Sequence, residues 1–522
     1  MCGILALFLR FSRSYSYPIS KVVKSFQILE NRGPDSGTLV VRDKDVMGFR
    51  RLAIVDRSVK GEQPFYSQES RLLCNGEIYN HVELEKRHGL QCASSSDCEC
   101  ILLLHDMFGF GQMLEELRGD YAIILTTGDI VYFARDPIGV RPLFYGHTKD
   151  GSFALASYAR ALTEFCPTVK QLLPGWGKYD LKTQKLELFP HNHTSYLVKS
   201  SVPKVEEIVR STLTESIRVR LMTDRPLGCL LSGGLDSSLI TSILCKLIGP
   251  SNVRTYSIGM KGSQDLKHAR LVADYLGTNH TEVLFTPKQG FDVIPDVIRD
   301  LESYDITTIR ASVAMWLLAK HISSSSTDVV LLSGEGADEL FCGYLYFHYA
   351  PSPDELAKES LRLLHQLYLY DVLRADRCIS SHGLELRVPF LDKEMVKLCM
   401  SLSGELREPQ GKIEKFLLRS SFTHGYLPKE VLWRRKDGMS DGVSGDSGKR
   451  WFEQIQEFVE EEVSDVVFMK NKNKFPSKEA YYYRLLYDDL FPTYQPQYDY
   501  WLPKWVDCGG DPSGRVIDVF NE

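Results

Sequence analysis

The hydrophobic and polar positions of the first third of the chain form short runs that are typical of strands. Runs rich in β-branched and aromatic residues alternate with Gly, Asn or Asp. The predicted strands are Gly3–Leu9, Thr38–Val41, Arg51–Val55, Arg71–Cys74, Asp120–Thr126 and Ile130–Ala134. Helical patterns occur around Ile19–Glu30 and over Cys98–Phe108. Strands in excess of helices predict a layered α+β domain, which we place at residues 2–190.

The pattern changes after residues 191–203, where His, Asn, Ser and Pro collect as in a linker. Between residue 204 and about Pro351, strands alternate with helices, and the rest of the chain to residue 522 is mostly helical. The predicted strands are Leu227–Leu231, Val253–Ile258, Glu282–Phe285 and Asp328–Leu332, and the predicted helices follow Asp236 and cover Asp265–Leu276 and Ile309–His321. This alternation predicts an α/β domain with a parallel sheet and helices on both faces, followed by a helical C-terminal part.

Composition and charge narrow the function classes. The chain has 522 residues, too many for one hydrophobic core, and its 43% hydrophobic and 25% charged residues are typical of a globular protein. A net charge of −6 gives no electrostatic reason to expect a nucleic-acid partner. No apolar run approaches the roughly 20 residues that span a bilayer, and Ile4–Leu9 lacks the flanks of a signal peptide. We therefore expect a cytoplasmic enzyme with no membrane partner.

The 12 cysteines are scattered, mostly within apolar runs, which is typical of free thiols in a reducing compartment. Cys92, Cys98 and Cys100 cluster, but no second Cys or His group follows at zinc-ligand spacing. We predict no metal site there.

The first candidate for chemistry is Met1-Cys2-Gly3. Removal of Met1 would make Cys2 the terminal residue, with its thiol and its own α-amine on one framework. A free α-amine has a pKa of roughly 7.7–8.0 and can accept a proton at neutral pH. Cys2 would then supply both nucleophile and general base. A cysteine at position 2 is by itself more simply an ordinary residue, so its companions must decide.

These companions are Arg51 before an apolar run, the string Asn75-Gly76-Glu77, and Asp97 at a helix start. A guanidinium fork suits a carboxylate, two carboxylates suit an ammonium, and an amide beside a glycine N–H suits an oxyanion. Taken singly, Arg51 and Asp97 are more simply a surface ion pair. Together they match the functional groups of glutamine.

With these residues, and with Arg32–Asp35 and Arg135–Leu143, the stretch from Cys2 to about Ser157 resembles the glutaminase domain of class II glutamine amidotransferases, which are N-terminal-nucleophile hydrolases. The resemblance implies that Cys2 attacks the side-chain amide and that Asn75 and the Gly76 N–H form the oxyanion hole. It also implies that Arg51 holds the α-carboxylate and that Glu77 and Asp97 hold the α-amine. The implied glutamine-binding residues are Arg51, Leu52, Ala53, Ile54, Val55, Asn75, Gly76, Glu77 and Asp97.

The second candidate is the loop Ser232–Ser238, Ser-Gly-Gly-Leu-Asp-Ser-Ser, between a predicted strand and a predicted helix. Its glycines let backbone N–H groups approach a phosphate, and the helix N-terminus favours negative charge. Asp236 adds a carboxylate for magnesium. The loop lacks the Gly-Lys ending of a Walker motif, and a plain strand–helix connection remains the alternative.

A third group, Ser333–Glu339, again follows a predicted strand. Its three carboxylates, at 335, 338 and 339, repel one another unless they meet a metal or a cation. A solvated acidic turn is the alternative.

The Ser232–Ser238 loop resembles the pyrophosphate loop of ATP pyrophosphatases. With the acidic loop and the strings around Arg310, Arg387 and Lys436, nearly the whole chain resembles the asparagine synthetase family. The resemblance implies that ATP and magnesium are the cofactors and that Glu335 acts at a β-aspartyl-adenylate step. Asp236 and Asp338 would hold magnesium, and Arg310, Asp338 and Arg387 would bind aspartate or pyrophosphate. The implied ATP-binding residues are Leu231, Ser232, Gly233, Gly234, Asp236, Ser237, Ile258, Ser333, Gly334 and Lys436.

The resemblance implies a carbon–nitrogen ligase that makes asparagine from aspartate with glutamine as the nitrogen donor. The sequence departs from the family at Lys436-Asp437-Gly438-Met439, where members usually have Lys-Glu-X-Phe, which puts the packing of that loop in doubt. The alternatives are a related ligase such as a β-lactam synthetase, and a non-catalytic relative. The sequence leaves the oligomeric state open, with a homodimer as one option.

Overall fold

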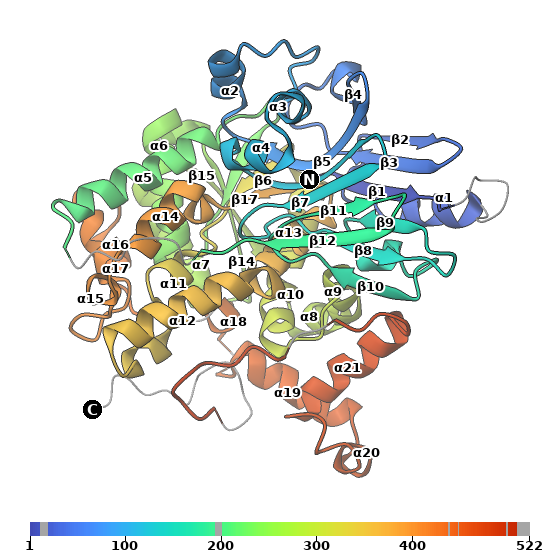
Figure 1. Ribbon diagram of the computed structural model, residues 1–522. Coiled ribbons are helices and arrows are strands. Elements are labelled where there is room, and N and C mark those ends of the chain that lie inside the picture. Colours follow the sequence, from blue (N-terminus) through green and yellow to red (C-terminus); the bar gives the residue numbers. More distant parts are fainter. Residues whose placement is uncertain (11–18, 194–200, 437–438, 447, 497–498, 509–522) are drawn as a thin grey trace.

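The structure is a computed structural model, and it describes residues 1–10, 19–193, 201–436, 439–446, 448–496 and 499–508. Figure 1 shows a part rich in strands beside a part rich in helices. Within the described residues, no helix is both long and apolar enough to cross a membrane.

The first part contains two antiparallel sheets of six strands. The first sheet has the order β10-β8-β9-β1-β3-β2, and its strands are β1 (Gly3–Phe8), β2 (Ser36–Val41), β3 (Asp45–Arg51), β8 (Phe144–His147), β9 (Phe153–Ala156) and β10 (Thr168–Gln171). The second sheet has the order β12-β11-β7-β6-β5-β4, and its strands are β4 (Phe65–Tyr66), β5 (Ser70–Ile78), β6 (Gly119–Thr127), β7 (Ile130–Arg135), β11 (Gly175–Asp180) and β12 (Lys185–Pro190).

The two sheets pack on each other through alternating apolar positions. Ile4 and Phe8 of the first sheet share a buried cluster with Ile124 and Phe133 of the second. The other face of the second sheet is covered by α2 (His81–His88), α3 (Cys100–Phe108) and α4 (Phe110–Glu116), and α1 (Ile19–Gln27) lies beside the first sheet. This is the predicted layered α+β domain, so that prediction is confirmed.

The second part is built on a five-stranded sheet in the order β15-β14-β13-β16-β17, with every neighbouring pair parallel. Its strands are β13 (Leu227–Leu230), β14 (Arg254–Gly259), β15 (Asn279–Leu284), β16 (Val330–Leu332) and β17 (Glu385–Arg387). The helices associated with the sheet are α5 (Val205–Val219), α6 (Leu235–Ile248), α7 (Gln264–Leu276), α8 (Pro287–Asp292), α9 (Ile294–Leu301), α10 (Ile306–Ser325), α11 (Ala337–Leu340) and α13 (Asp371–Ser380). The predicted parallel α/β sheet is therefore confirmed.

The strand order places a reversal between β13 and β16. The chain runs outward through β14 and β15, then returns to β16 and β17. Because such crossovers are right-handed, α6 and α7 lie on one face, and α10 and α13 lie on the other. Ligands of open α/β sheets bind where the order reverses, at the carboxyl ends of the strands. The loops after β13 and β16, which begin at Ser232 and Ser333, meet at this point.

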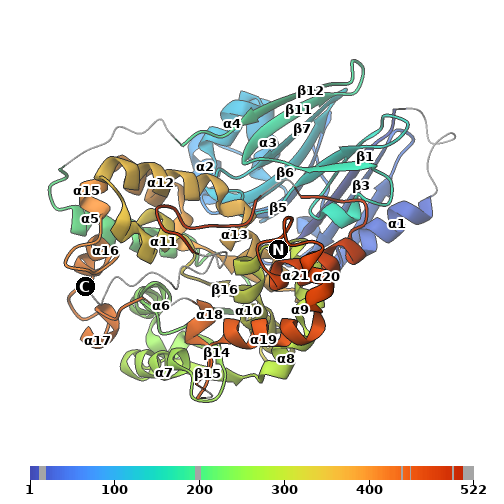
Figure 2. The same ribbon diagram turned by 90° about the horizontal axis from the view of Figure 1, so that it is seen from below.

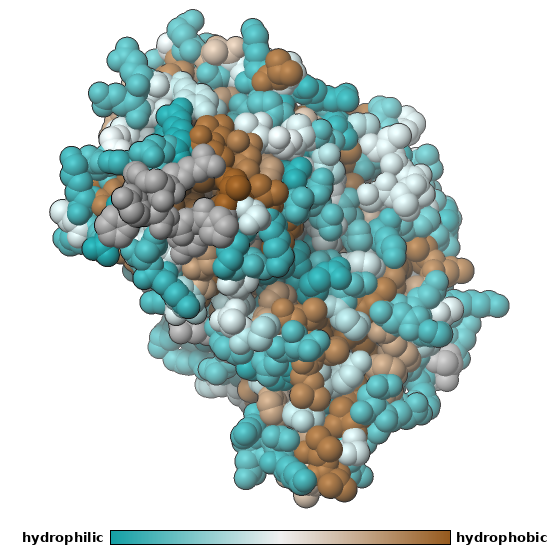
Figure 3. Space-filling model, turned by 90° about the vertical axis from the view of Figure 1, so that its right-hand side faces the viewer, coloured by the Kyte–Doolittle hydropathy of each residue, from teal (hydrophilic) through white to brown (hydrophobic). Residues whose placement is uncertain are grey.

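The remaining helices cover the second part (Figure 2). They are α12 (Pro353–Gln366), α14 (Lys393–Ser401), α15 (Gly404–Arg407), α16 (Phe416–Ser421), α17 (Lys429–Leu432), α18 (Met439–Gly442), α19 (Trp451–Glu462), α20 (Asp465–Met469) and α21 (Lys478–Leu490). On α20, Val466, Val467 and Met469 are exposed, and Figure 3 shows apolar surface toward this end of the molecule.

One strand prediction is wrong. The run Arg51–Val55 is not a strand, because β3 ends at Arg51. Beyond this point the backbone donors bond to side chains instead of a neighbouring strand: the Leu52 N–H donates to Cys2 Sγ (3.4 Å) and the Ala53 N–H to Asp35 Oδ2 (2.8 Å). An apolar run next to the predicted nucleophile is thus a loop that contacts it.

Candidate active sites

The Cys2 site lies where the two sheets of the first part meet. Cys2 directly precedes β1, and Gly3 pairs with Arg50 on β3. Asn75, Gly76 and Glu77 are on β5 of the other sheet, opposite residues 120–122 of β6. The Cys2 thiol contacts the loop after β3, 3.4 Å from the Leu52 nitrogen. Stacking of the sheets therefore brings the predicted nucleophile and its companions together from distant parts of the sequence.

Asn75 has an unusual environment. Its side chain is fully buried, yet among the described residues neither Oδ1 nor Nδ2 has a hydrogen-bond partner. Gly76 lies close to β6, because a Cβ added there would come within 2.1 Å of the Asp120 carbonyl oxygen. A buried amide whose polar atoms lack partners is rare and fits a group that bonds a ligand.

Two buried carboxylates adjoin the same site. Asp97 Oδ2 accepts a hydrogen bond from the Ile78 N–H (2.7 Å), and burial raises the pKa of Asp97 to about 6. Burial, followed by the charges of Glu385 and Asp97, raises the pKa of Glu77 well above its usual range. A ligand ammonium placed between Glu77 and Asp97 would favour their ionised forms.

The Arg51 guanidinium is held by the loop that follows. One Nη donates to the Ser58 carbonyl (2.8 Å) and lies 3.3 Å from Glu62 Oε1, and the other donates to the Asp56 carbonyl. The same loop reaches the second part of the chain, because the Asp224 N–H donates to the Ile54 carbonyl (2.9 Å). Residues 51–55 therefore connect the Cys2 site to the parallel-sheet domain.

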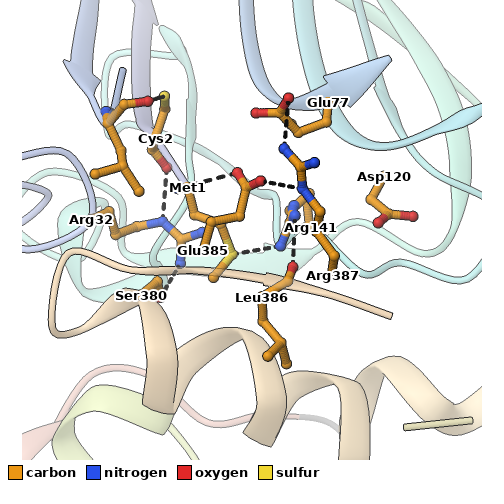
Figure 4. A network of polar contacts seen from close by, with 12 residues as sticks. Met1, Cys2, Arg32, Glu77, Asp120, Arg141, Ser380, Glu385, Leu386 and Arg387 are labelled. Carbon is orange, nitrogen blue, oxygen red and sulfur yellow. Dashed lines mark hydrogen bonds and ion pairs between the residues drawn. The ribbon is translucent and has the colours of Figure 1, made fainter. Parts of the chain in front are cut away.

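Met1 is present in the structure and precedes the predicted nucleophile. Its side chain is buried, its amine lies 3.5 Å from Glu385 Oε2, and burial lowers the pKa of that amine (Figure 4). While Met1 is present the nitrogen of Cys2 is an amide, and burial raises the pKa of the Cys2 thiol to about 11. With Met1 in place, Cys2 therefore has no free α-amine of its own to act as a base.

The second site is a cavity of about 570 Å³ at the carboxyl ends of β13 and β16, where the sheet order reverses. Most of the residues predicted to bind ATP, aspartate or pyrophosphate line it, as does Glu335, which was predicted to be catalytic. They are Leu231, Ser232, Gly234, Asp236, Ser237, Ile258, Arg310, Ser333, Gly334, Glu335, Asp338 and Lys436. Gly233 and Arg387 do not.

The loop after β13 has the form expected of a phosphate-binding turn. Gly233 has φ 75°, and Gly234 directly precedes α6. A Cβ added to Gly233 would lie 2.4 Å from the Ala269 nitrogen, so the turn also packs closely on α7. The hydroxyls of Ser232 and Ser237 lie 3.0 Å apart at the mouth of the turn.

Two lysines neutralise the carboxylates predicted to hold magnesium. Lys415 Nζ lies 2.6 Å from Asp236 Oδ2 and 2.6 Å from Asp338 Oδ1, and Lys436 also pairs with Asp338. Burial opposes ionisation of Asp338, but the two lysines hold its pKa below the usual range. Gly343 leaves room for Lys415, because a Cβ added there would lie 2.0 Å from its Cε.

The acidic pair fits a magnesium ion only as part of a larger ligand set. Asp236 Oδ1 is buried and accepts no hydrogen bond among the described residues. The same residues contain no group of three or more His, Cys, Asp or Glu side chains placed to hold a metal. Magnesium bound here would be coordinated by one or two carboxylates, and substrate phosphates and water would complete its coordination shell, as is common for Mg²⁺ in proteins.

Glu335 belongs to a second buried network in the cavity wall. Its Oε2 lies 2.8 Å from Arg374 Nη2, and the same nitrogen lies 2.8 Å from Asp371 Oδ1. Glu339 accepts a hydrogen bond from the Tyr344 hydroxyl (2.5 Å), and burial raises the pKa of Glu339 to about 8.

Sequence reasoning missed several of these residues. Lys415, Asp371 and Arg374 line the cavity but lie in no motif. Glu339, in contrast, was indicated by the sequence, because it belongs to the same acidic loop as Glu335 and Asp338.

Two arginines predicted to bind aspartate or pyrophosphate form ion pairs that the sequence did not indicate. Arg310 pairs with Glu479 of α21, with Nε 2.8 Å from Oε1, and both side chains are buried. Arg387 lies outside the cavity, 3.3 Å from Glu77 Oε2 and 2.8 Å from Glu385 Oε1.

Residues 208–355 and 349–506 match the asparagine synthase family, and residues 1–183 match the glutamine amidotransferase domain family. The chain belongs to the asparagine synthase family. Within this family it is 40% identical over 566 residues to the glutamine-hydrolysing asparagine synthetase of Gallus gallus, covering 99% of this chain and 98% of the relative. The enzymes of Rattus norvegicus and Homo sapiens are 41% and 40% identical over 564 and 565 residues, with the same two coverages.

The family departure predicted at Lys436-Asp437-Gly438-Met439 falls partly outside the described residues. Asp437 and Gly438 are not described, but Lys436 is described and pairs with Asp338. The lysine of the motif is thus in the cavity.

Proposed function

We propose that the protein is a glutamine-hydrolysing asparagine synthetase. It would convert ATP, aspartate, glutamine and water to AMP, diphosphate, asparagine and glutamate. The observation that carries the proposal is that one chain contains two sites. One is the Cys2 site, where the buried Asn75 amide makes no hydrogen bond among the described residues. The other is the cavity lined by the Ser232–Ser238 loop, at the point where the strand order of the parallel sheet reverses. The near-full-length similarity to glutamine-hydrolysing asparagine synthetases supports it.

In the first reaction, removal of Met1 would give Cys2 a free amine that accepts the thiol proton. The thiolate attacks the side-chain amide of glutamine, ammonia leaves, and water hydrolyses the glutamyl thioester. Asn75 Nδ2 and the Gly76 N–H donate to the oxyanion. Arg51 holds the α-carboxylate, and Glu77 and Asp97 hold the α-ammonium.

In the second reaction, aspartate is adenylated by ATP and ammonia displaces AMP from β-aspartyl-AMP. N–H groups at the start of α6 and the Ser232 and Ser237 hydroxyls hold the departing pyrophosphate. Lys436 offsets its charge, and Glu335 takes a proton from the attacking ammonia. Magnesium, when bound at Asp236 and Asp338, supplies further charge neutralisation for the phosphates.

The test is an assay of the purified protein with glutamine, aspartate and ATP, in which AMP, diphosphate and asparagine are measured together. All three products are expected in equal amounts. Formation of AMP with another carboxylate, and none with aspartate, would contradict the substrate assignment.

A Cys2→Ala variant separates the two sites. We expect it to lose glutamine hydrolysis by a factor of about 10³ or more, because no nucleophile remains, and to make asparagine from ammonium chloride at the wild-type rate. Intact mass of the wild-type protein checks that Met1 is removed. Undiminished glutamine hydrolysis by Cys2→Ala would refute the proposed first site.

The cellular location is part of the proposal. All 12 cysteines are free, which fits a reducing compartment such as the cytoplasm.

A further inference from the structure

Arg387 stands on β17 of the ATP-binding part, yet its charge is directed at the Cys2 site (Figure 4). The side chain is fully buried, and one Nη lies 3.3 Å from Glu77 Oε2. Glu77 is one of the two carboxylates assigned to the α-ammonium of glutamine. An ion pair therefore crosses from one half of the chain to the substrate site of the other.

The guanidinium is fixed on its other sides. Nε donates to Glu385 Oε1 (2.8 Å), and Nη1 donates to the carbonyls of Arg220 (2.7 Å) and Met222 (2.6 Å). Because the fork is planar and rigid, these three contacts determine where Nη2 points. It points at Glu77.

The contact between Arg387 and Glu77 leaves the carboxylate able to bind a ligand. Neither Arg387 Nη2 nor Glu77 Oε2 makes a hydrogen bond among the described residues, so at 3.3 Å they interact as charges. Lone pairs of the Glu77 carboxylate therefore remain available for a ligand ammonium, while Arg387 fixes the position of the carboxylate.

The positive charge of Arg387 also favours the ionised form of Glu77, against the other influences on this carboxylate. Burial, Glu385 and Asp97 all raise the pKa of Glu77, and Arg387 lowers it. A protonated Glu77 would attract an ammonium weakly, because the interaction depends on the ionised form.

We propose that Arg387 is a positioning residue for glutamine: it holds Glu77 in place and charged, so that the glutamine site is complete only when both halves of the chain meet. The inference rests on the proposed function. It differs from the assignment of Arg387 to aspartate or pyrophosphate, because Arg387 does not line the cavity that Asp338 lines.

The test compares full-length Arg387→Met with Arg118→Met. Arg118 also joins the two halves, with Nε 3.0 Å and Nη2 2.9 Å from the carboxylate of Asp392, a residue that is not part of the glutamine site. We expect Arg387→Met to lower kcat/KM for glutamine about 10- to 100-fold, mainly through KM, and to leave ammonia-dependent synthesis and KM for aspartate within about twofold. Arg118→Met should leave KM for glutamine unchanged.

A second readout depends on the α-ammonium alone. Glutaramate, which is glutamine without its α-amine, cannot use Glu77. The preference of the wild type for glutamine over glutaramate should shrink in Arg387→Met by the same factor as the loss in kcat/KM. A merely structural defect would lower kcat/KM equally for glutamine and glutaramate and leave the preference unchanged.

Three results would overturn the inference: an unchanged KM for glutamine, an unchanged preference over glutaramate, or a raised KM for aspartate with lost ammonia-dependent synthesis. If Arg387→Met fails to fold, Arg387→Lys keeps the buried charge but not the fork, and it must show a smaller shift in the same preference. A wild type that makes no asparagine from ammonia would instead refute the proposed function.

Discussion

Asn75 is fully buried, yet neither polar atom of its side-chain amide has a partner among the described residues. Glu77 Oε2 and Asp236 Oδ1 also make no hydrogen bond among these residues, although Glu77 Oε2 lies 3.3 Å from Arg387 Nη2. Each such group costs roughly 1–3 kcal/mol of stability, a cost that folding alone does not explain. All three residues lie at positions where a substrate or metal group is expected, so at the residue scale a ligand could satisfy these atoms.

A pH dependence follows from Asp97. Because burial raises its pKa to about 6, Asp97 becomes neutral as the pH falls through this value and its attraction for the α-ammonium of glutamine is lost. We expect KM for glutamine to rise below about pH 6, and Asp97→Asn to raise KM at neutral pH and remove the change near pH 6. Steady-state kinetics between pH 5.5 and 8 check this, with ammonia-dependent synthesis as the control. A wild-type KM that is flat across this range would contradict the role of Asp97.

At the scale of elements, the Ser232–Ser238 turn is set by the contact of Gly233 with α7. The sequence suggested that this glycine lets phosphate approach, whereas the structure adds a packing reason. Gly233 has φ 75°, and a Cβ would lie 2.4 Å from the Ala269 nitrogen and 2.5 Å from the His268 carbonyl carbon. These contacts are with backbone atoms of α7, which cannot shift without moving the helix. The turn and α7 therefore fix each other's position.

Gly233→Ala should therefore push the turn away from α7. We expect a loss of about 2–3 kcal/mol in the free energy of unfolding and a large fall in ATP-dependent AMP formation. Glutamine hydrolysis at the Cys2 site should persist, because the atoms nearest to a Cβ added at Gly233 belong to α7 and not to that site. Urea unfolding and the two partial assays measure these effects.

Gly249→Ala is the matched control. Gly249 also has positive φ (85°), at the end of α6, but an added Cβ would meet only the Asn252 side chain at 3.5 Å. It should lose about 1 kcal/mol and keep AMP formation. If both variants behave alike, contact with α7 is not what matters at Gly233.

The sequence predicted the elements whose pattern is local. The alternation of strand and helix from β13 to β16 was correctly predicted, because the inner strands β13, β14 and β16 are mostly buried and read as short apolar runs, and each crossover returns to the same sheet. The Arg51–Val55 strand was wrong, since its backbone donors bond to Cys2 and Asp35, which lie far away in sequence.

The same distinction applies to the sites. Residues within strings, such as 232–238 and 333–339, were found because loop geometry ties them together. Lys415 and Arg374 were missed because only tertiary packing brings them to the cavity. The orientation of Arg387 could not be predicted either, because it depends on how the two halves meet.

At the scale of the whole molecule, buried ion pairs join the halves. Asp376 of α13 lies 2.8 Å from Arg32 Nη1 and 3.3 Å from Arg141 Nη1, and all three side chains are buried. Both arginines come from the first part of the chain. A charge removed here leaves buried partners without a counter-charge.

Asp376→Asn should accordingly lower the free energy of unfolding by about 3–5 kcal/mol and split the thermal transition, as the halves separate before they unfold. Differential scanning calorimetry measures both effects. The control is Asp45→Asn, which breaks the 2.6 Å pair with Arg71 inside the first part. That partly exposed pair should cost only about 1 kcal/mol and leave the transition single. A single, barely shifted transition in Asp376→Asn would show that this pair does not join the halves.

Lys415 has a consequence for how the nucleotide enters. Its ammonium already stands between Asp236 and Asp338, 2.6 Å from each, where a divalent ion would be expected. Magnesium bound there with ATP, as proposed above, would displace the Lys415 ammonium, and its measured affinity would report only the difference between the two cations. The same ammonium offsets the repulsion between the two carboxylates, which stand in the first turns of α6 and α11.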